Sequence, residues 1–223
     1  MESKKKDRVL EIRDLGITNY QEALEIQNCL AQNRYSGSVC DTLLLTEHYP
    51  VVTIGRSGND DDLRYSEGSL KLRGIDLINT DRGGKATYHG PGQMVAYPII
   101  KLHHRDLREY LEKLISVCME TIVRFGVAAR KMEDKPGLYV GGDKILSVGI
   151  ALRRWVTCHG VALNVNNDLT PFNMIIPCGE PGLKMTSLKT LLARPVDMED
   201  VKAEFVRRFL KIFGYRPKRG NPP

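Results

Sequence analysis

The sequence predicts an α/β protein in which an antiparallel or mixed β-sheet carries helices on its outside. Three observations lead to this prediction: three segments with helical apolar spacing, seven short apolar segments typical of strands, and short links between most of those strands. Because the links are rich in Gly, Asp and Asn, they favour hairpins over the long crossovers of a doubly wound nucleotide-binding fold.

The helical segments are residues 19–32, 106–125 and 197–213. In each, apolar side chains recur three or four positions apart and so share one face. The last helix begins at an Asp197 cap and ends before Gly214. Cys29 and Cys118 fall within the first two helices, and we expect both in the core.

The strand segments are residues 43–45, 51–54, 75–79, 94–100, 138–140, 144–152 and 156–164. Gly141-Gly142-Asp143 is the clearest turn, and the last two strands form a hairpin with its tip near Arg153-Arg154. Strand alternation places His159 on the same face as Val161, with Cys158 on the opposite, core face.

Length and charge limit the architecture and the partners. The 223 residues, 42% of them apolar, are enough for one large core, and we expect one domain over residues 1–215 with a disordered tail at 216–223. The net charge of +6 (33 minus 27) is compatible with an ordinary soluble surface or with an acidic partner. The basic residues are scattered with little aromatic interleaving, which argues against nucleic-acid recognition.

The chain has five cysteines, an odd number without C-x-x-C pairs. This pattern indicates neither a disulfide framework nor a structural zinc site, and it favours reduced thiols in the cytoplasm. No apolar run is long enough to span a membrane. The basic N-terminus contains Glu2 and Asp7 and leads into no apolar run, unlike a secretory signal.

Cys178 lies in the segment Ile175-Ile176-Pro177-Cys178-Gly179, where an apolar approach meets a rigid proline and a residue without a side chain. Two interpretations are open. Cys178 is either a buried cysteine at a strand-to-loop corner or a nucleophile, provided that a nearby group stabilises its thiolate.

The segment RGGKATYHGPGQ, residues 82–93, holds the densest group of turn and polar residues. Gly90-Pro91-Gly92 suits a type II turn, and Gly83-Gly84 permits close approach of a ligand. The spacing matches neither a Walker A loop nor G-x-G-x-x-G. The segment is therefore a turn-rich hairpin or a ligand-binding loop.

Three further side chains are candidates for proton chemistry or for plain structural roles. His89 and His159 are each a structural histidine or a general base. Lys144, at the start of a strand, would by position alone be a solvated strand-end lysine.

Taken together, ordered motifs resemble the lipoyl(octanoyl) transferases and span most of the chain, from about residue 42 to residue 188. They are His48-x-Pro50-Val51-x-Thr53-x-Gly55-Arg56, Arg82-Gly83-Gly84 through Tyr88-His89-Gly90-Pro91-Gly92-Gln93, Lys144-Ile145, His159-Gly160, Leu163-Asn164, Pro177-Cys178-Gly179 and Thr186-Ser187-Leu188. Glu180-Pro181 is more polar than the pattern of this family.

The resemblance implies a single catalytic domain with a biotin/lipoate protein ligase-like fold, in which a larger mixed β-sheet and a smaller sheet carry helices outside. The implied reaction moves an octanoyl group from octanoyl-acyl carrier protein to the lipoyl-domain lysine of 2-oxoacid dehydrogenase subunits and the glycine cleavage H protein. No metal, dissociable cofactor, nucleic acid or membrane is implied.

The same resemblance assigns roles to residues. It makes Cys178 the acyl-thioester nucleophile and Lys144 its activating partner, because an ammonium favours a neighbouring thiolate. It lines the acyl pocket with Arg82, Gly83, Gly84, Lys85, Ala86, Thr87, Tyr88, His89, Ser147, Val148, Gly149, Gly160, Val161 and Ala162. His159 is a possible supporting residue, and the backbone N–H groups of Cys178-Gly179 or of the loop glycines are candidates to hold an oxyanion.

Two alternatives remain. An ATP-dependent lipoate- or biotin-type protein ligase shares the implied fold, but it activates a carboxylate as an adenylate and needs no cysteine. A non-catalytic module that binds acyl chains or their carrier would leave Cys178 with a structural role only.

Overall fold

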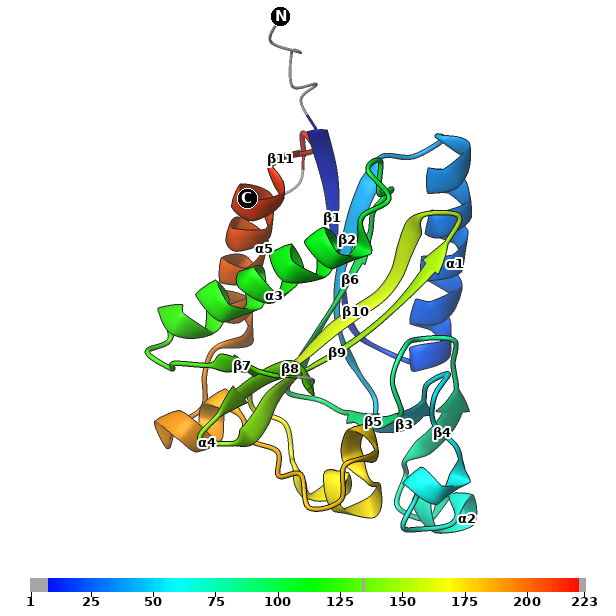
Figure 1. Cartoon of the computed structure of the whole chain (residues 1–223), viewed down its shortest axis with the longest axis vertical. Helices are drawn as coiled ribbons and strands as arrows, with labels where there is room; N and C mark the ends of the chain where they lie inside the picture. Colours follow the sequence, from blue (N-terminus) through cyan, green and yellow to red (C-terminus); the bar gives the residue numbers. More distant parts are fainter. Residues whose placement is uncertain (1–7, 134, 221–223) are drawn as a thin grey trace, which may run out of the picture.

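The computed structural model describes residues 8–133 and 135–220, which form two β-sheets with helices packed outside them (Figure 1). Across these residues the larger sheet contains, from edge to edge, β11 (Tyr215–Pro217), β1 (Arg8–Thr18), β2 (Asp41–His48), β6 (Gln93–Ile99), β10 (Val156–Asn164), β9 (Asp143–Arg153), β8 (Lys135–Val140) and β7 (Arg130–Met132). The smaller sheet contains β4 (Asp76–Asn79), β3 (Val51–Ile54) and β5 (Ala86–His89). Both sheets combine parallel and antiparallel pairs, so the predicted mixed architecture is confirmed.

The two faces of the larger sheet carry different helices (Figure 1). Helix α1 (Tyr20–Ser36) covers one face, while α3 (Leu107–Arg124) and α5 (Met198–Phe213) pack together on the other. Strand alternation separates the two cores: Leu43 and Leu45 pack with α3 and α5, and Leu44 packs with α1. Two short helices, α2 (Glu67–Lys71) and α4 (Leu188–Leu192), lie in the connections.

The strongest local signals are confirmed. Asp106 and Asp197 accept hydrogen bonds from the first turns of α3 and α5, and Gly214 ends α5 in a left-handed conformation with φ of 69°. Gly141 and Gly142 have φ of 60° and 100° and close a two-residue hairpin between β8 and β9.

Non-local pairing creates elements that the sequence did not predict. β1 is largely exposed and highly charged, and β5 lies inside the glycine-rich loop 82–93. The expectation of a disordered tail at 216–223 was wrong for Arg216 and Pro217. These residues belong to β11, which pairs in parallel with β1. Residues 221–223 lie outside the described residues. These strands form by pairing with segments far away in the chain, so no local sequence pattern predicts them.

The expectation that Cys29 lies in the core was also wrong, because Cys29 is exposed. The buried face of α1 is set by Ala23, Gln27 and Leu30, and Cys29 points away from that face. Cys118 is buried as expected.

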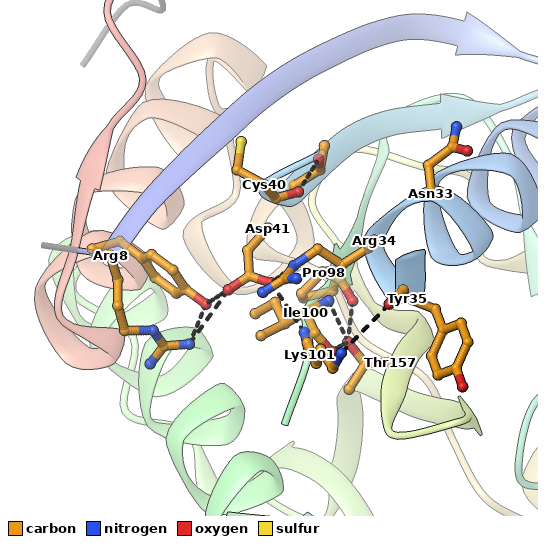
Figure 2. Close-up of polar contacts among 12 residues, drawn as sticks. Arg8, Asn33, Arg34, Tyr35, Cys40, Asp41, Pro98, Ile100, Lys101 and Thr157 are labelled. Atoms are coloured by element: carbon orange, nitrogen blue, oxygen red, sulfur yellow. Dashed lines mark hydrogen bonds and ion pairs between the residues drawn. The ribbon is translucent and has the colours of Figure 1, made fainter. Parts of the chain in front are cut away.

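Asp41, at the start of β2, joins several elements at one corner of the fold (Figure 2). Its carboxylate is 5% exposed and accepts hydrogen bonds from Arg34 at 2.6 Å, from the Lys101 amide at 3.0 Å and from the Tyr215 hydroxyl at 2.6 Å. Arg8 lies on the other side at 3.6 Å. These contacts pair the buried charge and tie α1, β1, β2, β11 and the segment after β6 together.

Candidate active site

A cavity of about 180 Å³ lies on the α1 side of the larger sheet, beneath β5 and the loop that precedes it. The predicted site residues that line it are Cys178, Lys144, Arg82, Gly84, Lys85, Ala86, Thr87, His89, Ser147, Val148, Gly149, His159, Gly160, Val161 and Ala162. They come from three strands and two loops, so the tertiary structure gathers motifs that are up to 96 positions apart (178 minus 82).

Lys144 and Cys178 meet at this cavity. The Lys144 Nζ atom donates a hydrogen bond to Cys178 Sγ at 2.9 Å, although the two residues are 34 positions apart. Lys144 is 1% exposed and is not a solvated strand-end lysine. Its backbone is held by the segment after Cys178: Lys144 N donates to Lys184 O, and Thr186 N donates to Lys144 O, both at 2.9 Å.

The Cys178 sulfur is the hydrogen-bond partner of the Lys144 amine. Among residues 8–133 and 135–220, no carboxylate forms an ion pair with Lys144. The amine lies 5.4 Å from the centre of the Tyr139 ring, where a cation is attracted to the aromatic face.

Cys178 sits in a strained backbone conformation. Its φ is 58° and that of Gly179 is 68°, so a non-glycine residue occupies the left-handed region beside the cavity. Glycine suits position 179 because of this positive φ, and a Cβ atom there would displace the flexible Lys85 side chain, 2.1 Å away. The tight turn presents the sulfur to the cavity while leaving it partly exposed.

Arg82 is a buried clamp for the loop that it begins. Its guanidinium is 7% exposed and donates to the Thr53 hydroxyl, to the Thr53 carbonyl at 2.6 Å and to the Lys85 carbonyl at 2.7 Å. Burial lowers its pKa. No carboxylate forms an ion pair with it in the part of the chain that the structure describes.

Two buried histidines, His89 in the cavity wall and His48 behind it, are neutral, and their tautomers follow from their partners. His48 Nδ1 must carry the proton because it contacts the Thr18 carbonyl at 3.0 Å, so Nε2 accepts from the Tyr97 hydroxyl at 2.7 Å. His89 Nδ1 donates to Gln93 Oε1 at 2.7 Å, because the amide nitrogen of Gln93 is already a donor to two carbonyl oxygens. Burial lowers the pKa of His48 to about 4 and that of His89 well below its usual value.

His159 departs from the expected strand alternation. Its φ of 57° turns its side chain to the α1 side, where Nε2 donates to Asp81 Oδ1 at 2.8 Å and Nδ1 faces the Tyr20 hydroxyl at 3.4 Å. The expectation that His159 shares a face with Val161 was therefore wrong, because the backbone of His159 is left-handed. Burial lowers the pKa of His159 against the opposing effect of Asp81.

Two predicted pocket residues lie outside the cavity lining. Gly83 packs against β9, where its N–H donates to Ile150 O at 2.9 Å. Tyr88 points to the opposite face of β5 and packs edge-on against Phe172 with ring centres 5.5 Å apart. The period of two along β5 explains why Thr87 and His89 reach the cavity while Tyr88 does not.

Sequence reasoning missed other cavity residues. They are Tyr20, Val95, Tyr97, Lys135, Pro136, Tyr139 and Glu180. Tyr20 and Tyr97 belong to apolar patterns that predicted burial, but burial does not distinguish a core residue from a pocket wall. Lys135 pairs with Glu180 beside Cys178, so the unusual polar residue after the Pro-Cys-Gly motif has a charged partner.

Two negative findings apply to residues 8–133 and 135–220. No group of three or more His, Cys, Asp or Glu side chains is arranged to hold a metal ion. No helix combines the length and apolar character needed to cross a membrane.

Comparisons with known proteins agree with this geometry. Residues 19–210 match the family described as the lipoyl protein ligase A/B catalytic domain. An octanoyltransferase of Geobacter metallireducens is 44% identical over 200 residues, covering 89% of this chain and 91% of the relative. An octanoyltransferase of Rubrobacter xylanophilus is 41% identical over 217 residues, covering 96% and 98%.

Solved structures support the fold. A putative lipoate protein ligase from Thermoplasma acidophilum with bound lipoic acid has a TM-score of 0.74 at 17% identity, covering 96% of this chain and 88% of that one. A biotin protein ligase from Aquifex aeolicus has a TM-score of 0.58 at 14% identity, covering 92% and 70%. The predicted ligase-like fold is therefore confirmed, and the extent and identity of the sequence matches establish that this chain belongs to the octanoyltransferase family.

Proposed function

We propose that this protein transfers an octanoyl group from octanoyl-acyl carrier protein to a lysine of lipoyl domains, through a thioester on Cys178. The observation that carries the proposal is the 2.9 Å contact between Lys144 Nζ and Cys178 Sγ at the edge of a partly open, mainly apolar cavity. A thiolate beside an ammonium is an activated nucleophile, and the cavity suits an alkyl chain.

In the first half-reaction, the Cys178 thiolate attacks the donor thioester carbonyl. A carbon–sulfur bond to Cys178 forms while an electron pair moves to the carbonyl oxygen. When that pair returns, the bond to the carrier's sulfur breaks, and the Lys144 ammonium supplies the proton that the departing thiolate takes up. The chain is left as octanoyl-Cys178 with a neutral Lys144 amine.

In the second half-reaction, the amine of the acceptor lysine attacks the octanoyl-Cys178 carbonyl. The Lys144 amine takes the proton that the attacking nitrogen loses, and the Cys178 thiolate leaves. One amide bond forms, one thioester bond breaks, and the Lys144–Cys178 pair returns to its starting charge. No other reactant is consumed.

The alkyl chain would be held by burial in the cavity. Burial contributes about 0.8 kcal/mol per methylene, so chain length is discriminated chiefly by how deep the cavity is. The wall of Ser147-Val148-Gly149 on β9 and Gly160-Val161-Ala162 on β10 would contact the chain along its length. The acceptors would be lipoyl domains of 2-oxoacid dehydrogenase subunits and the glycine cleavage H protein, and we place the reaction in the cytoplasm.

The test is mass spectrometry of the full chain mixed with octanoyl-acyl carrier protein in the absence of ATP. We expect a mass increase of one octanoyl group, which Cys178→Ser abolishes and the exposed-cysteine control Cys29→Ser retains. Pyrophosphate release that requires ATP, without an adduct, would indicate a ligase. Tight carrier binding with neither an adduct nor pyrophosphate would indicate a non-catalytic binding module.

A further inference from the structure

The loop of residues 82–85 has an unusual imbalance in its backbone hydrogen bonds: each carbonyl oxygen accepts a hydrogen bond, but of the four amides only that of Gly83 donates one to a described residue. The Arg82 carbonyl accepts from Arg56 N at 2.9 Å, and the Gly83 carbonyl accepts from Arg82 Nη1 at 3.1 Å. The Gly84 carbonyl accepts from Ser57 N at 3.2 Å. The Lys85 carbonyl accepts from Gly55 N at 3.3 Å and from Arg82 Nη2 at 2.7 Å. The N–H groups of Gly84 and Lys85 have no acceptor among the described residues. Gly84 is exposed and Lys85 is partly exposed, so these two donors are open to solvent in the free protein and can bind a ligand in its place.

The direction of these two amides follows from the peptide geometry. In a trans peptide the N–H points opposite to the preceding C=O. The Gly84 carbonyl faces Ser57, so the Lys85 N–H points away from the smaller sheet. Gly84 has φ of 88°, and a left-handed residue brings consecutive N–H groups into one anion-binding concavity. Both residues line the cavity that also contains Cys178.

Arg82 adds a positive charge to the same place. Its guanidinium is 7% exposed, lines the cavity and has no carboxylate ion pair among residues 8–133 and 135–220. A buried charge without a counter-ion is costly unless a ligand supplies the opposite charge. Its hydrogen bond to Gly83 O also holds the carbonyl that orients the Gly84 N–H.

Two competing glycine donors are already engaged, while the Cys178 N–H, like those of Gly84 and Lys85, has no acceptor among the described residues. Gly179 N–H donates to Ile176 O at 2.9 Å, and Gly83 N–H donates to Ile150 O at 2.9 Å. Of the glycine amides near the sulfur that the sequence suggested for an oxyanion, Gly83 and Gly179 are thus satisfied within the protein and Gly84 is free.

We propose that the N–H groups of Gly84 and Lys85, backed by the Arg82 charge, form a binding site for a negatively charged acyl oxygen. During transfer the ligand is the oxyanion that forms when the Cys178 thiolate adds to the thioester carbonyl, and this role rests on the proposed function. The same site binds the carboxylate of free octanoate, which makes medium-chain fatty acids ligands of the resting protein.

Amide hydrogen exchange followed by NMR tests the site directly. In the free full-length protein we expect the Gly84 and Lys85 amides to exchange rapidly, and saturating octanoate to protect both by at least about ten-fold. The Gly83 and Gly179 amides are internal controls whose protection should not change. Octan-1-ol, which has the same chain but no charge, should fill the cavity without protecting Gly84 or Lys85.

Calorimetric titration distinguishes the contribution of the two backbone amides to octanoate binding from the contributions of the nearby cationic side chains. We expect octanoate to bind about ten-fold more tightly than octan-1-ol, and Arg82→Met to abolish this preference. Lys85→Met removes the ammonium, which lies 3.7 Å from Asp62 and packs beside Gly179, but keeps the Lys85 backbone amide, so the preference should survive. If Arg82→Met does not fold, the exchange measurement on the unaltered protein still decides whether the Gly84 and Lys85 amides bind the carboxylate.

Equal affinity for octanoate and octan-1-ol, or octanoate binding that leaves the Gly84 and Lys85 amides unprotected, would overturn the proposal. A preference that disappears in Lys85→Met would also overturn it, because the ammonium would then be the site. Octanoate binding needs no chemistry at Cys178, so a failure of thioester formation and a failure of this anion site are separate results.

Discussion

The side chain of Lys144 crosses the backbone of Gly137 on the neighbouring strand β8. A Cβ atom at position 137 would lie 2.7 Å from Lys144 Cε and 2.3 Å from the Leu146 carbonyl, and the φ of Gly137 is 121°. The contact between the Lys144 amine and Cys178 therefore depends on a residue without a side chain that belongs to none of the motifs.

We expect Gly137→Ala to displace the Lys144 amine and slow octanoylation of Cys178 by at least ten-fold, since the amine must lie within hydrogen-bond reach of the sulfur. Stability should fall by about 1–3 kcal/mol through backbone strain. Gly141→Ala is the matched control, because it has φ of 60° but open space around it. It should lose stability while retaining the acylation rate per folded molecule. Equal rates in both variants would contradict the role given to Gly137.

Lys144→Met tests the amine itself. The fold should be retained or stabilised, because an apolar side chain of similar length replaces a buried charge. Acylation of Cys178 should slow by about 100-fold at neutral pH, as expected when a positioned proton donor is removed. Rapid-quench mass spectrometry gives the rate, and urea unfolding gives the stability. Lys135→Met, which removes the partner of Glu180, is the control. Unchanged acylation in Lys144→Met from pH 6 to pH 9 would remove Lys144 from the mechanism.

The buried histidines predict how stability depends on pH. The pKa values of His48, His89 and His159 are all lowered by burial. Below about pH 6.5 the unfolded chain binds protons that the folded chain excludes, so the free energy of unfolding falls as pH decreases and is level above pH 7. Each histidine contributes a slope of up to about 1.4 kcal/mol per pH unit. Urea unfolding between pH 5 and pH 8 measures it, and a stability that is constant or rises on acidification would contradict the prediction.

Asp81 acts in a separate, lower pH window. Burial raises the pKa of Asp81, but hydrogen bonds from His159 and Arg153 outweigh this effect and hold it at about 2. Its contribution to stability is present above the unfolded-state pKa of about 4 and is lost as pH falls toward 2. Replacing it by Asn should therefore flatten the unfolding curve between pH 4 and pH 2 while leaving the histidine slope above pH 5 in place.

Ala162 on β10 faces Val95 on β6, and both line the cavity. Ala162→Leu adds bulk to the wall and should reduce octanoylation relative to hexanoylation by at least ten-fold, since about two methylenes lose their space at about 0.8 kcal/mol each. Competition between octanoyl- and hexanoyl-carrier protein, read by the mass of the adduct, gives the ratio. A folding defect lowers both adducts equally, so an unchanged ratio would show that this wall does not limit chain length.

Local sequence patterns were sufficient to predict most of the helices and strands. The boundaries of α3 and α5 follow from Asp106, Asp197 and Gly214, whose capping roles act within one helical turn. The hairpin between β8 and β9 follows from Gly141-Gly142, because few other residues adopt consecutive positive φ angles.

The elements that the sequence did not predict depend on distant partners. β1 and β11 lie near opposite ends of the described chain and form strands by pairing with each other. β5 is a strand because Thr87 and its neighbours pair with β3, although the segment is full of turn residues. Strand formation is stabilised by cross-strand contacts, so the local sequence carries only part of the signal.

The amino-acid sequence by itself determined the fold class, the caps and the motifs that identify the family, because these depend on residue type at short spacing. The tertiary structure alone decided that Lys144 reaches Cys178, that His159 turns toward Asp81, and that Tyr88 points away from the cavity. These outcomes depend on sheet register, on left-handed backbone at single residues and on which amides remain unpaired after folding. Each is a property of long-range packing, which no local spacing encodes.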